Sequence, residues 1–269
     1  MDVTSQIIVV VALTFVIHLI TTLSYAVRIV GIRTGRIAVS FALFNVLVLV
    51  SRTSNSIQAP LLAKYVENGI HVAATNDIEV TFRLILVAST VATLIGILLI
   101  PTFQRVFTRA VESFVVHRSV PSVIMHGFSK GGLRHLVDCL CVPSGQNIHA
   151  LRSFGRIPFR LLLANVVAVA LLTVGVLASL YAGYLAPEVR VTALSLSPII
   201  NGAATILMFI MIDPYLSALT DDVVAGDLAP SAFRQAVIQM VAARTVGTIV
   251  AQLLFLPAAS AIAAIARHI

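Results

Sequence analysis

Two arginines stand inside stretches that are otherwise apolar enough to cross a lipid bilayer. Arg52 lies within IAVSFALFNVLVLVSRTSNSIQAPLLA (37–63), and Arg244 lies within VAARTVGTIVAQLLF (241–255). A guanidinium at the centre of a membrane-spanning helix costs about 2.5–3.5 kcal/mol on insertion scales, so such residues usually face a bundle interior and mark functional sites. Because the planar fork of arginine matches phosphate oxygens, the chemistry indicated is recognition of an anion within the membrane.

Each arginine shares its helical face with small or polar side chains, which suits the wall of a hydrated cavity better than contact with lipid. Around the first arginine the face holds Asn45, Arg52, Ser56 and Ala59, with Asn55 beside it. Around the second it holds Arg244, Gly247, Thr248 and Ala251. The threonine after each arginine adds a hydroxyl donor, so the predicted anion-binding residues are Arg52, Arg244, Asn55, Thr53 and Thr245.

Polar positions on the neighbouring predicted helices complete the lining of this cavity: His18, Tyr25, Asn45, Asn201 and Asp213. For His18 two roles stay open, hydrogen-bonded packing and proton relay, and packing is favoured. Asp213 is the one acidic candidate for neutralising an intramembrane arginine, because carboxylates are almost absent from the predicted spans. Otherwise the negative charge must come from an anion outside the protein, such as a lipid pyrophosphate.

The elements that carry these residues are predicted to be transmembrane helices. Of the 269 residues, 59% are hydrophobic and only 11% are charged, whereas soluble domains carry about 25% charged residues. Apolar stretches recur along the chain, which predicts an all-α polytopic membrane protein forming a single transmembrane domain, residues 1–269. About six helices are predicted, at roughly 3–25, 37–63, 81–100, 160–184, 191–212 and 232–256. No basic segment precedes residues 3–23, so these are predicted to be a retained helix and not a cleaved signal peptide.

The distribution of basic residues predicts the orientation. Arginine and lysine are concentrated in the connections after helices 1 and 3, so by the positive-inside rule these connections are cytoplasmic and both termini are outside. A long basic cytoplasmic loop, about 101–159, joins helices 3 and 4. Its first part, PTFQRVFTRAVESFVVHR (101–118), is predicted to be an amphipathic helix that contacts anionic lipids, with a solvated connector as the alternative.

Two segments far apart in the sequence align, which predicts an internal repeat. SRTSNSIQAPLL (51–62) aligns with ARTVGTIVAQLL (243–254), and TGRIAVS (34–40) aligns with AGDLAPS (225–231). Helix pairs 1–2 and 5–6 would then be parallel repeats related by an axis along the membrane normal. The domain would comprise repeat A (about 3–63), helix 3 with the basic loop and helix 4 (about 81–184), and repeat B (about 191–256).

The cytoplasmic loops of the two repeats carry opposite charges. Arg28, Arg33 and Arg36 follow helix 1, whereas Asp221 and Asp222 follow helix 5. Pairing across a central axis would make these residues a cytoplasmic entrance and gate. Two independently solvated loops are the alternative, since exposed ion pairs contribute little to stability.

The sequence motifs do not favour an enzyme or a metal-binding protein. No HExxH or Walker A motif occurs, so neither an enzyme nor a cofactor is predicted. Six potential ligands do gather in the central loop, namely His117, His126, His135, Cys139, Cys141 and His149. Because their spacing matches no known zinc site, no metal ion is predicted.

Three segments resemble the signatures of the Amj family, the alternate lipid II flippases of bacteria. They are HLITTLSYAVRIVGIRTGRIAVSFALFNVLVLVSRTSNSIQAPLLAKYVE (18–67), DPYLSALTDDVVAG (213–226) and ARTVGT (243–248). The resemblance implies a protein of the bacterial cytoplasmic membrane that moves lipid II, the undecaprenyl-pyrophosphate-linked peptidoglycan precursor, from the inner to the outer leaflet. Its partner would be lipid II and not a nucleic acid. That Arg52 and Arg244 bind the pyrophosphate is inferred from their charge and helical phase, and not from the family.

Two other functions remain as alternatives. A polyprenyl-pyrophosphate phosphatase would also use buried arginines, but it needs a nucleophile or metal-binding carboxylates beside them, and only serines and Asp213 are offered. A purely structural membrane protein would tolerate replacement of Arg52 and Arg244 by leucine.

Overall fold

The computed structural model describes residues 3–72, 75–120, 122, 138–141 and 157–269. Within these ranges the chain is almost entirely helical and has no strand. Six of its helical segments are long and apolar enough to cross a membrane. The prediction of an all-α polytopic membrane protein with about six transmembrane helices is confirmed.

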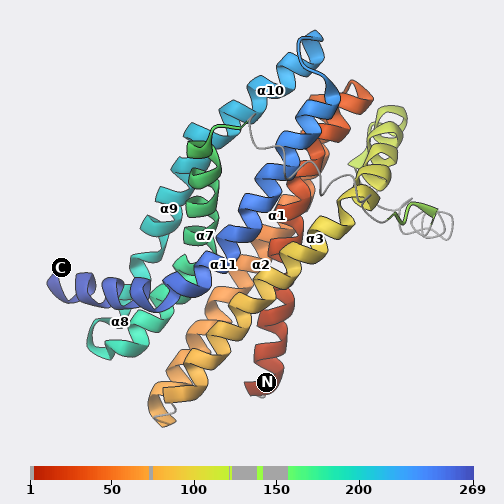
Figure 1. Ribbon diagram of the computed structural model, residues 1–269. Helices are drawn as coiled ribbons and strands as arrows, with labels where there is room; N and C mark the ends of the chain where they lie inside the picture. Colours follow the sequence, from red (N-terminus) through yellow and green to blue (C-terminus); the bar gives the residue numbers. More distant parts are fainter. Residues whose placement is uncertain (1–2, 73–74, 121, 123–137, 142–156) are drawn as a thin grey trace.

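The six segments follow one another along the chain (Figure 1). The first four are α1 (Val3–Thr34), α2 (Ile37–Val72), α3 (Thr75–His117) and α7 (Phe159–Leu185). The fifth is composed of η1 (Pro187–Val189), α8 (Arg190–Ser195), α9 (Ser197–Leu207), η2 (Met208–Ile212) and α10 (Asp213–Ala225), and the sixth is α11 (Pro230–His268). Most segments extend beyond the predicted ranges, because hydropathy marks the hydrocarbon layer whereas a helix continues into the polar region.

The helices form two packed groups. The first helix, α1, packs against both α2 and α3, whereas α11 packs along α7, and α7 also contacts α9. Contacts of α11 with α3 and α1 join the two groups. Both chain ends lie at the same end of the bundle, and α10 lies at the opposite end with the turn between α1 and α2 (Figure 1).

Small residues let α7 and α11 approach each other closely, as they do in many membrane bundles. A Cβ atom on Gly247 of α11 would lie only 2.8 Å from the Val166 carbonyl oxygen and from Val169 Cβ of α7. On the α7 side, Ala168 and Ala170 are fully buried. This seam fixes the rotation of α11 about its axis, and therefore the direction in which Arg244, three residues before Gly247, projects.

Two glycines with positive φ end the helices that precede α2 and α11. Gly35 has φ +66°, and Gly226 has φ +87°. In each case the next residue closes the turn, with Arg36 N–H donating to the Gly31 carbonyl and Asp227 N–H donating to the Asp222 carbonyl. Glycine adopts this left-handed conformation without steric cost. The predicted repeat aligns these two glycines, but α2 packs along α1 whereas α11 packs mainly on α7, so the repeat stays a prediction.

The fifth segment widens into a π-helical turn at η2, directly before Asp213. Pro214 has no N–H to donate, and its ring crowds the carbonyl one turn earlier, so a regular α-helix cannot pass through it unchanged. The backbone N–H of Asp213 instead donates to the Met208 carbonyl, five residues back. The extra residue in this turn alters the direction in which the Asp213 carboxylate points.

The predicted amphipathic helix at 101–118 forms the last part of α3, which continues through Pro101. Phe107 and Val111 are buried there in a cluster with Val27 and Val30 of α1. The Phe107 ring also meets the Phe44 ring of α2 edge-on, at 6.4 Å between centroids. This part of α3 therefore closes over the ends of α1 and α2, while its predicted contact with anionic lipid stays a prediction.

Candidate functional site

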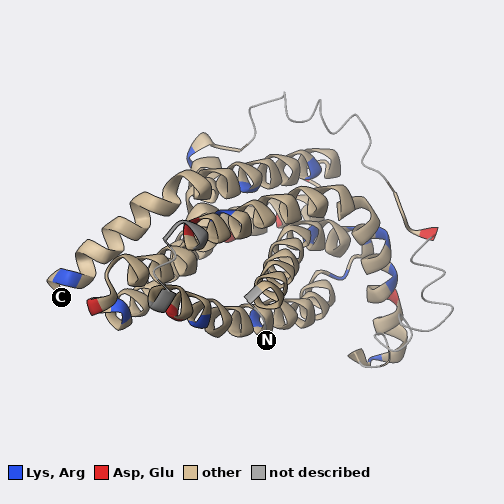
Figure 2. Ribbon diagram, turned by 90° about the horizontal axis from the view of Figure 1, so that it is seen from below, with Lys and Arg blue, Asp and Glu red and all other residues tan. Residues whose placement is uncertain are grey.

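Charged residues are sparse on the helices (Figure 2), so the surroundings of each one are informative. Arg244 of α11 is buried, with 6% of its surface exposed. Its Nε donates to Thr22 Oγ1 at 3.1 Å and its Nη2 donates to Thr21 Oγ1 at 2.5 Å. Tyr25 also lies near this guanidinium. No carboxylate within the described part of the chain pairs with this guanidinium or neutralises its positive charge.

The two threonines are prepared as acceptors by their place on α1. Thr22 Oγ1 donates to the His18 carbonyl at 2.6 Å, and Thr21 Oγ1 donates to the Ile17 carbonyl at 2.7 Å. Because each hydroxyl proton is used within the helix, the oxygen lone pairs are left for the guanidinium. These neutral contacts hold Arg244 in place without supplying the opposite charge.

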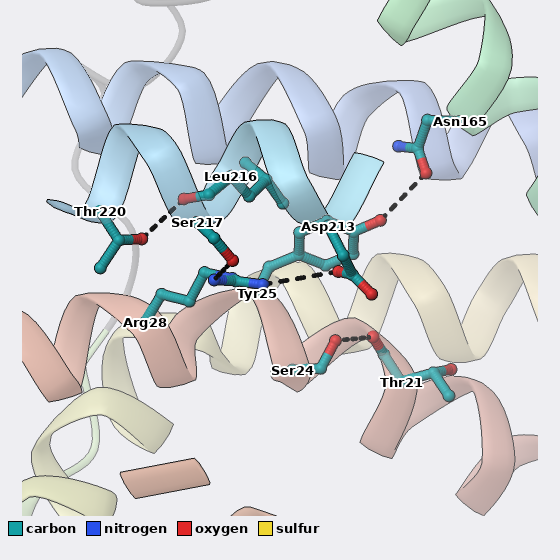
Figure 3. A network of polar contacts seen from close by, with 9 residues as sticks. All are labelled: Thr21, Ser24, Tyr25, Arg28, Asn165, Asp213, Leu216, Ser217 and Thr220. Atoms are coloured by element: carbon teal, nitrogen blue, oxygen red, sulfur yellow. Dashed lines mark hydrogen bonds and ion pairs between the residues drawn. The ribbon is translucent and has the colours of Figure 1, made fainter. Parts of the chain in front are cut away.

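Two hydrogen bonds link α1, α7 and α11 near this guanidinium, and Figure 3 shows the first of them. The Tyr25 hydroxyl of α1 donates to Asn165 Oδ1 of α7 at 3.1 Å. The Asn165 amide nitrogen in turn donates to the Met240 carbonyl of α11 at 2.8 Å. Asn165 is fully buried, so the bond from Tyr25 satisfies an acceptor that water does not reach.

Replacing Tyr25 by phenylalanine is expected to lower the free energy of unfolding by about 1–3 kcal/mol, because Asn165 Oδ1 would be buried without a donor. Thermal unfolding of the purified protein in detergent measures the change. The matched control is Tyr184→Phe, since the Tyr184 hydroxyl has no hydrogen-bond partner among the described residues. Equal effects of the two substitutions would show that the Tyr25 hydroxyl contributes nothing particular.

Arg28 lies further along α1, and it does have an acidic partner. Its Nη1 donates to Ser217 Oγ at 3.0 Å, and its Nη2 lies 3.5 Å from Asp213 Oδ1 (Figure 3). The guanidinium also lies 5.0 Å from the centre of the Phe41 ring, a distance that allows a cation–π interaction. The Arg28 side chain is 13% exposed and that of Asp213 is 42% exposed, so the pair is open on the acidic side.

A pocket of about 100 Å³ adjoins this ion pair. Tyr25 and Arg28 of α1, Phe41 and Phe44 of α2, and Asp213 of α10 contribute to its walls. The pocket therefore lies between the Arg28–Asp213 ion pair and Tyr25, the residue whose hydroxyl donates to Asn165.

The predicted gate residues differ in their surroundings. Asp213 pairs with Arg28, and not with either of the two intramembrane arginines that prompted the prediction. Arg33 and Arg36 are exposed, as are Asp221 and Asp222, and no ion pair joins these four side chains in the described part of the chain. Asp221 contributes to the electrostatic field at Arg28. The wider gate stays a prediction.

Arg52 lies in an environment unlike that of Arg244. It is exposed on α2, together with the predicted site residues Asn45, Thr53 and Asn55. Ser51, Ser54 and Gln58 form the buried face of this helix instead. Neither Arg52 nor Arg244 lines the pocket beside Arg28 or a second pocket between α1, α2, α3 and α7. The structure therefore does not bring the two arginines together in either pocket.

Two remaining predicted residues lie on the second group of helices. Thr245 is half-buried, and its hydroxyl donates to the Val241 carbonyl of its own helix at 3.1 Å. Asn201 of α9 directs its amide oxygen towards Gly175 of α7, where a Cβ atom would lie 2.5 Å from it. Among the described residues this oxygen has no hydrogen-bond partner.

A second pocket, of about 60 Å³, lies where α1, α2, α3 and α7 meet. Its polar lining is Thr14, His18, Asn55, Gln58, Ser89 and Thr173. Gln58 Nε2 donates to Thr14 Oγ1 at 2.7 Å and so joins α2 to α1. Of the predicted residues, this pocket gathers His18 and Asn55.

The residues of these contacts that sequence reasoning missed include Thr21, Asn165 and Ser217. The rule that selected Arg52 and Arg244 would have found Asn165, because it is an isolated amide in the apolar run FRLLLANVVAVALL (159–172). The two others carry no such signal, since serine and threonine in membrane helices commonly bond their own backbone.

The polar residues of α1 form one stripe. His18, Thr21, Thr22, Tyr25 and Arg28 are three or four residues apart or adjacent to such positions, so they share a helical face. The stripe extends over about 15 Å, at 1.5 Å per residue. It joins the neutral pocket at His18, the buried guanidinium of Arg244, and the charged pocket at Arg28.

Fold and site together define a polytopic α-helical membrane protein whose interior carries a cation that no carboxylate among the described residues neutralises. The chain matches the family model described as Amj, alternate to MurJ, over residues 13–266, and it belongs to this family. It is 38% identical over 269 residues to the lipid II flippase Amj of Bacillus subtilis (strain 168), a match that covers 97% of each chain. No solved structure matches the chain. The resemblance seen in the sequence is thus confirmed.

Proposed function

We propose that this chain is a lipid II flippase of the bacterial cytoplasmic membrane. It moves the undecaprenyl-pyrophosphate-linked peptidoglycan precursor from the inner to the outer leaflet, with both termini outside. The observation that carries the proposal is the 38% identity, over almost the whole of both chains, to a protein named as a lipid II flippase. The proposed orientation of the chain agrees with the arginine-rich connections on one side, which the positive-inside rule assigns to the cytoplasm.

The polar stripe of α1 suits the negatively charged pyrophosphate of the proposed substrate. A pyrophosphate esterified at both ends carries two negative charges, and arginine binds such oxygens through paired, charge-assisted hydrogen bonds. In our proposal Arg28 meets the pyrophosphate first, because it lies nearest to the predicted cytoplasmic end. Arg33 and Arg36 precede it at the entrance, where they attract the anion through solvent.

Asp213 acts in this scheme as an internal competitor for Arg28. The ion pair is 3.5 Å long and the carboxylate is 42% exposed, so an incoming phosphate oxygen can replace the carboxylate without opening the core. When the substrate moves on, Asp213 returns to Arg28. Exchange of this kind keeps binding weak enough for release.

Arg244 is the next binding position along the stripe. Its partners Thr21 and Thr22 are neutral, so the ligand supplies the negative charge that this buried site lacks. Arg52, Thr53 and Asn55 are proposed to contact the headgroup from the exposed face of α2, while Thr245 lies beside Arg244 on α11. The polyprenyl chain stays in the lipid throughout.

Asp213→Asn is expected to tighten the binding of lipid II about tenfold, or about 1.4 kcal/mol, since it removes the competing carboxylate but keeps the side chain's shape. Arg28→Gln is expected to weaken binding by a similar factor, and the double variant should behave like Arg28→Gln. Binding to the purified protein in detergent is the measurement. If Asp213→Asn weakened binding as Arg28→Gln does, the pair would be structural and the competition scheme wrong.

The function itself is tested with lipid II in vesicles that contain the purified protein. Leaflet-specific labelling should show lipid II reaching the opposite leaflet, with no release of phosphate. Complementation of a flippase-depleted bacterium by the wild type gives the corresponding result in cells. Phosphate release would identify an enzyme of the phosphatase type, and vesicles in which lipid II stays in one leaflet would contradict the proposal.

A further inference from the structure

His18 is a titratable group that the proposed route does not use. Its Nδ1 atom is buried and has no hydrogen-bond partner among the described residues. The side chain lines the pocket of about 60 Å³ between α1, α2, α3 and α7. That pocket is polar and large enough for water, so a proton can reach the ring without the helices separating.

The surroundings of His18 are neutral with one exception. The lining presents Asn55 and Gln58 from α2, Ser89 from α3 and Thr173 from α7, and none of them carries a charge. The charged group that acts on His18 is Arg244, from α11. Within the described part of the chain, no carboxylate borders the pocket.

His18 and Arg244 are also joined through hydrogen bonds. The guanidinium donates to Thr22 Oγ1 at 3.1 Å, and this hydroxyl donates to the His18 carbonyl at 2.6 Å. The guanidinium beside Thr22 and the residue His18 therefore lie about one helical turn apart along the stripe of α1. A charge that arrives at one of them is felt at the other, because burial weakens the screening by solvent.

We infer that His18 is a proton-binding site whose occupancy is linked to the anion held at Arg244. Without the anion, burial of the ring and then the nearby guanidinium disfavour a positive charge at His18. A pyrophosphate diester brings two negative charges, of which Arg244 balances one and a protonated His18 balances the other. The loaded site is then electrically neutral, the state that a low-dielectric interior favours.

This inference rests on the proposed function and adds a consequence for its energetics. Linkage is reciprocal, so a proton on His18 tightens the binding of the anion by the same factor as the anion tightens the binding of the proton. Translocation of the headgroup is thereby coupled to uptake and release of a proton. The proton comes from bulk solvent and reaches the Nδ1 lone pair through water in the pocket, so no hydroxide is left there, and no covalent bond of the substrate changes.

The test counts protons when lipid II binds to the purified wild-type protein. Isothermal titration at about pH 5.5, in two buffers with different ionisation enthalpies, should show uptake of close to one proton per lipid II. Binding should be on the order of tenfold tighter at about pH 5.5 than at about pH 8. Both charges of the diester stay fixed over this range, so the substrate itself does not produce the dependence.

Variants assign the proton to its residue. His18→Gln should bind lipid II without proton uptake and with nearly the same affinity at both pH values, whereas His268→Gln, at the exposed end of α11, should behave like the wild type. His18→Asn serves as a second variant, and folding of each is checked by gel filtration and thermal unfolding. If neither variant folds, the proton count of the wild type decides.

The outcomes separate this inference from the proposed function. Binding of lipid II without proton uptake by the wild type, or with uptake that persists in His18→Gln, overturns the role of His18 and leaves the flippase proposal standing. A wild type that binds no lipid II at either pH overturns both.

Discussion

Replacing Arg244 by methionine will reduce lipid II transport on the order of 10- to 100-fold, while the protein stays in the membrane at its normal level. The substitution removes the charge-assisted hydrogen bonds proposed for the pyrophosphate, and such bonds contribute about 1.5–3 kcal/mol. It does not destabilise the fold severely, because methionine resembles the arginine stem in shape and the lost charge has no acidic partner within the described residues. Removing an unpaired buried charge offsets the loss of the bonds to Thr21 and Thr22.

Transport in vesicles and complementation in cells measure this effect, and immunoblotting of the membrane fraction measures abundance. The matched control is Arg234→Met on the same helix, since Arg234 is exposed. Arg234→Met should retain transport. If Arg244→Met lowered abundance as much as transport, Arg244 would be a folding residue, and unchanged transport would remove it from the route.

Alanine at Gly247 will destabilise the protein by about 1–3 kcal/mol, the usual cost of overpacking a close interface. The new Cβ would lie 2.8 Å from the Val166 carbonyl oxygen and from Val169 Cβ, so α7 and α11 must move apart. Movement of α11 would also shift Arg244 relative to Thr21 and Thr22. Transport per molecule is therefore expected to fall together with thermal stability.

The matched control for this substitution is Gly202→Ala in α9, where no atom lies within 4 Å of the new Cβ. Since alanine is the better helix former by about 0.8–1 kcal/mol, Gly202→Ala should be neutral or stabilising. Thermal unfolding in detergent compares the two variants. A Gly247→Ala protein as stable as Gly202→Ala would mean that the α7–α11 seam is looser than described.

Much of this molecule could be predicted from local sequence. The length of an apolar run is matched to the thickness of the bilayer, so six spans could be counted without knowing their neighbours. Isolated polar residues within such runs marked Arg244, and helical periodicity placed His18 and Tyr25 on one face of the first helix. These are properties of a single helix, and they do not depend on the rest of the chain.

Only the tertiary structure determines which residues those helical faces contact. Arg52 and Arg244 have similar local sequences, yet Arg244 is buried against Thr21 and Thr22 whereas Arg52 is exposed. The partner of Asp213 is Arg28, about 185 residues away, and their meeting depends on the π-helical turn and on how α10 lies across α1. Helical phase specifies the direction of a side chain relative to its own axis, but the neighbour that it reaches depends on close packing between helices distant in sequence.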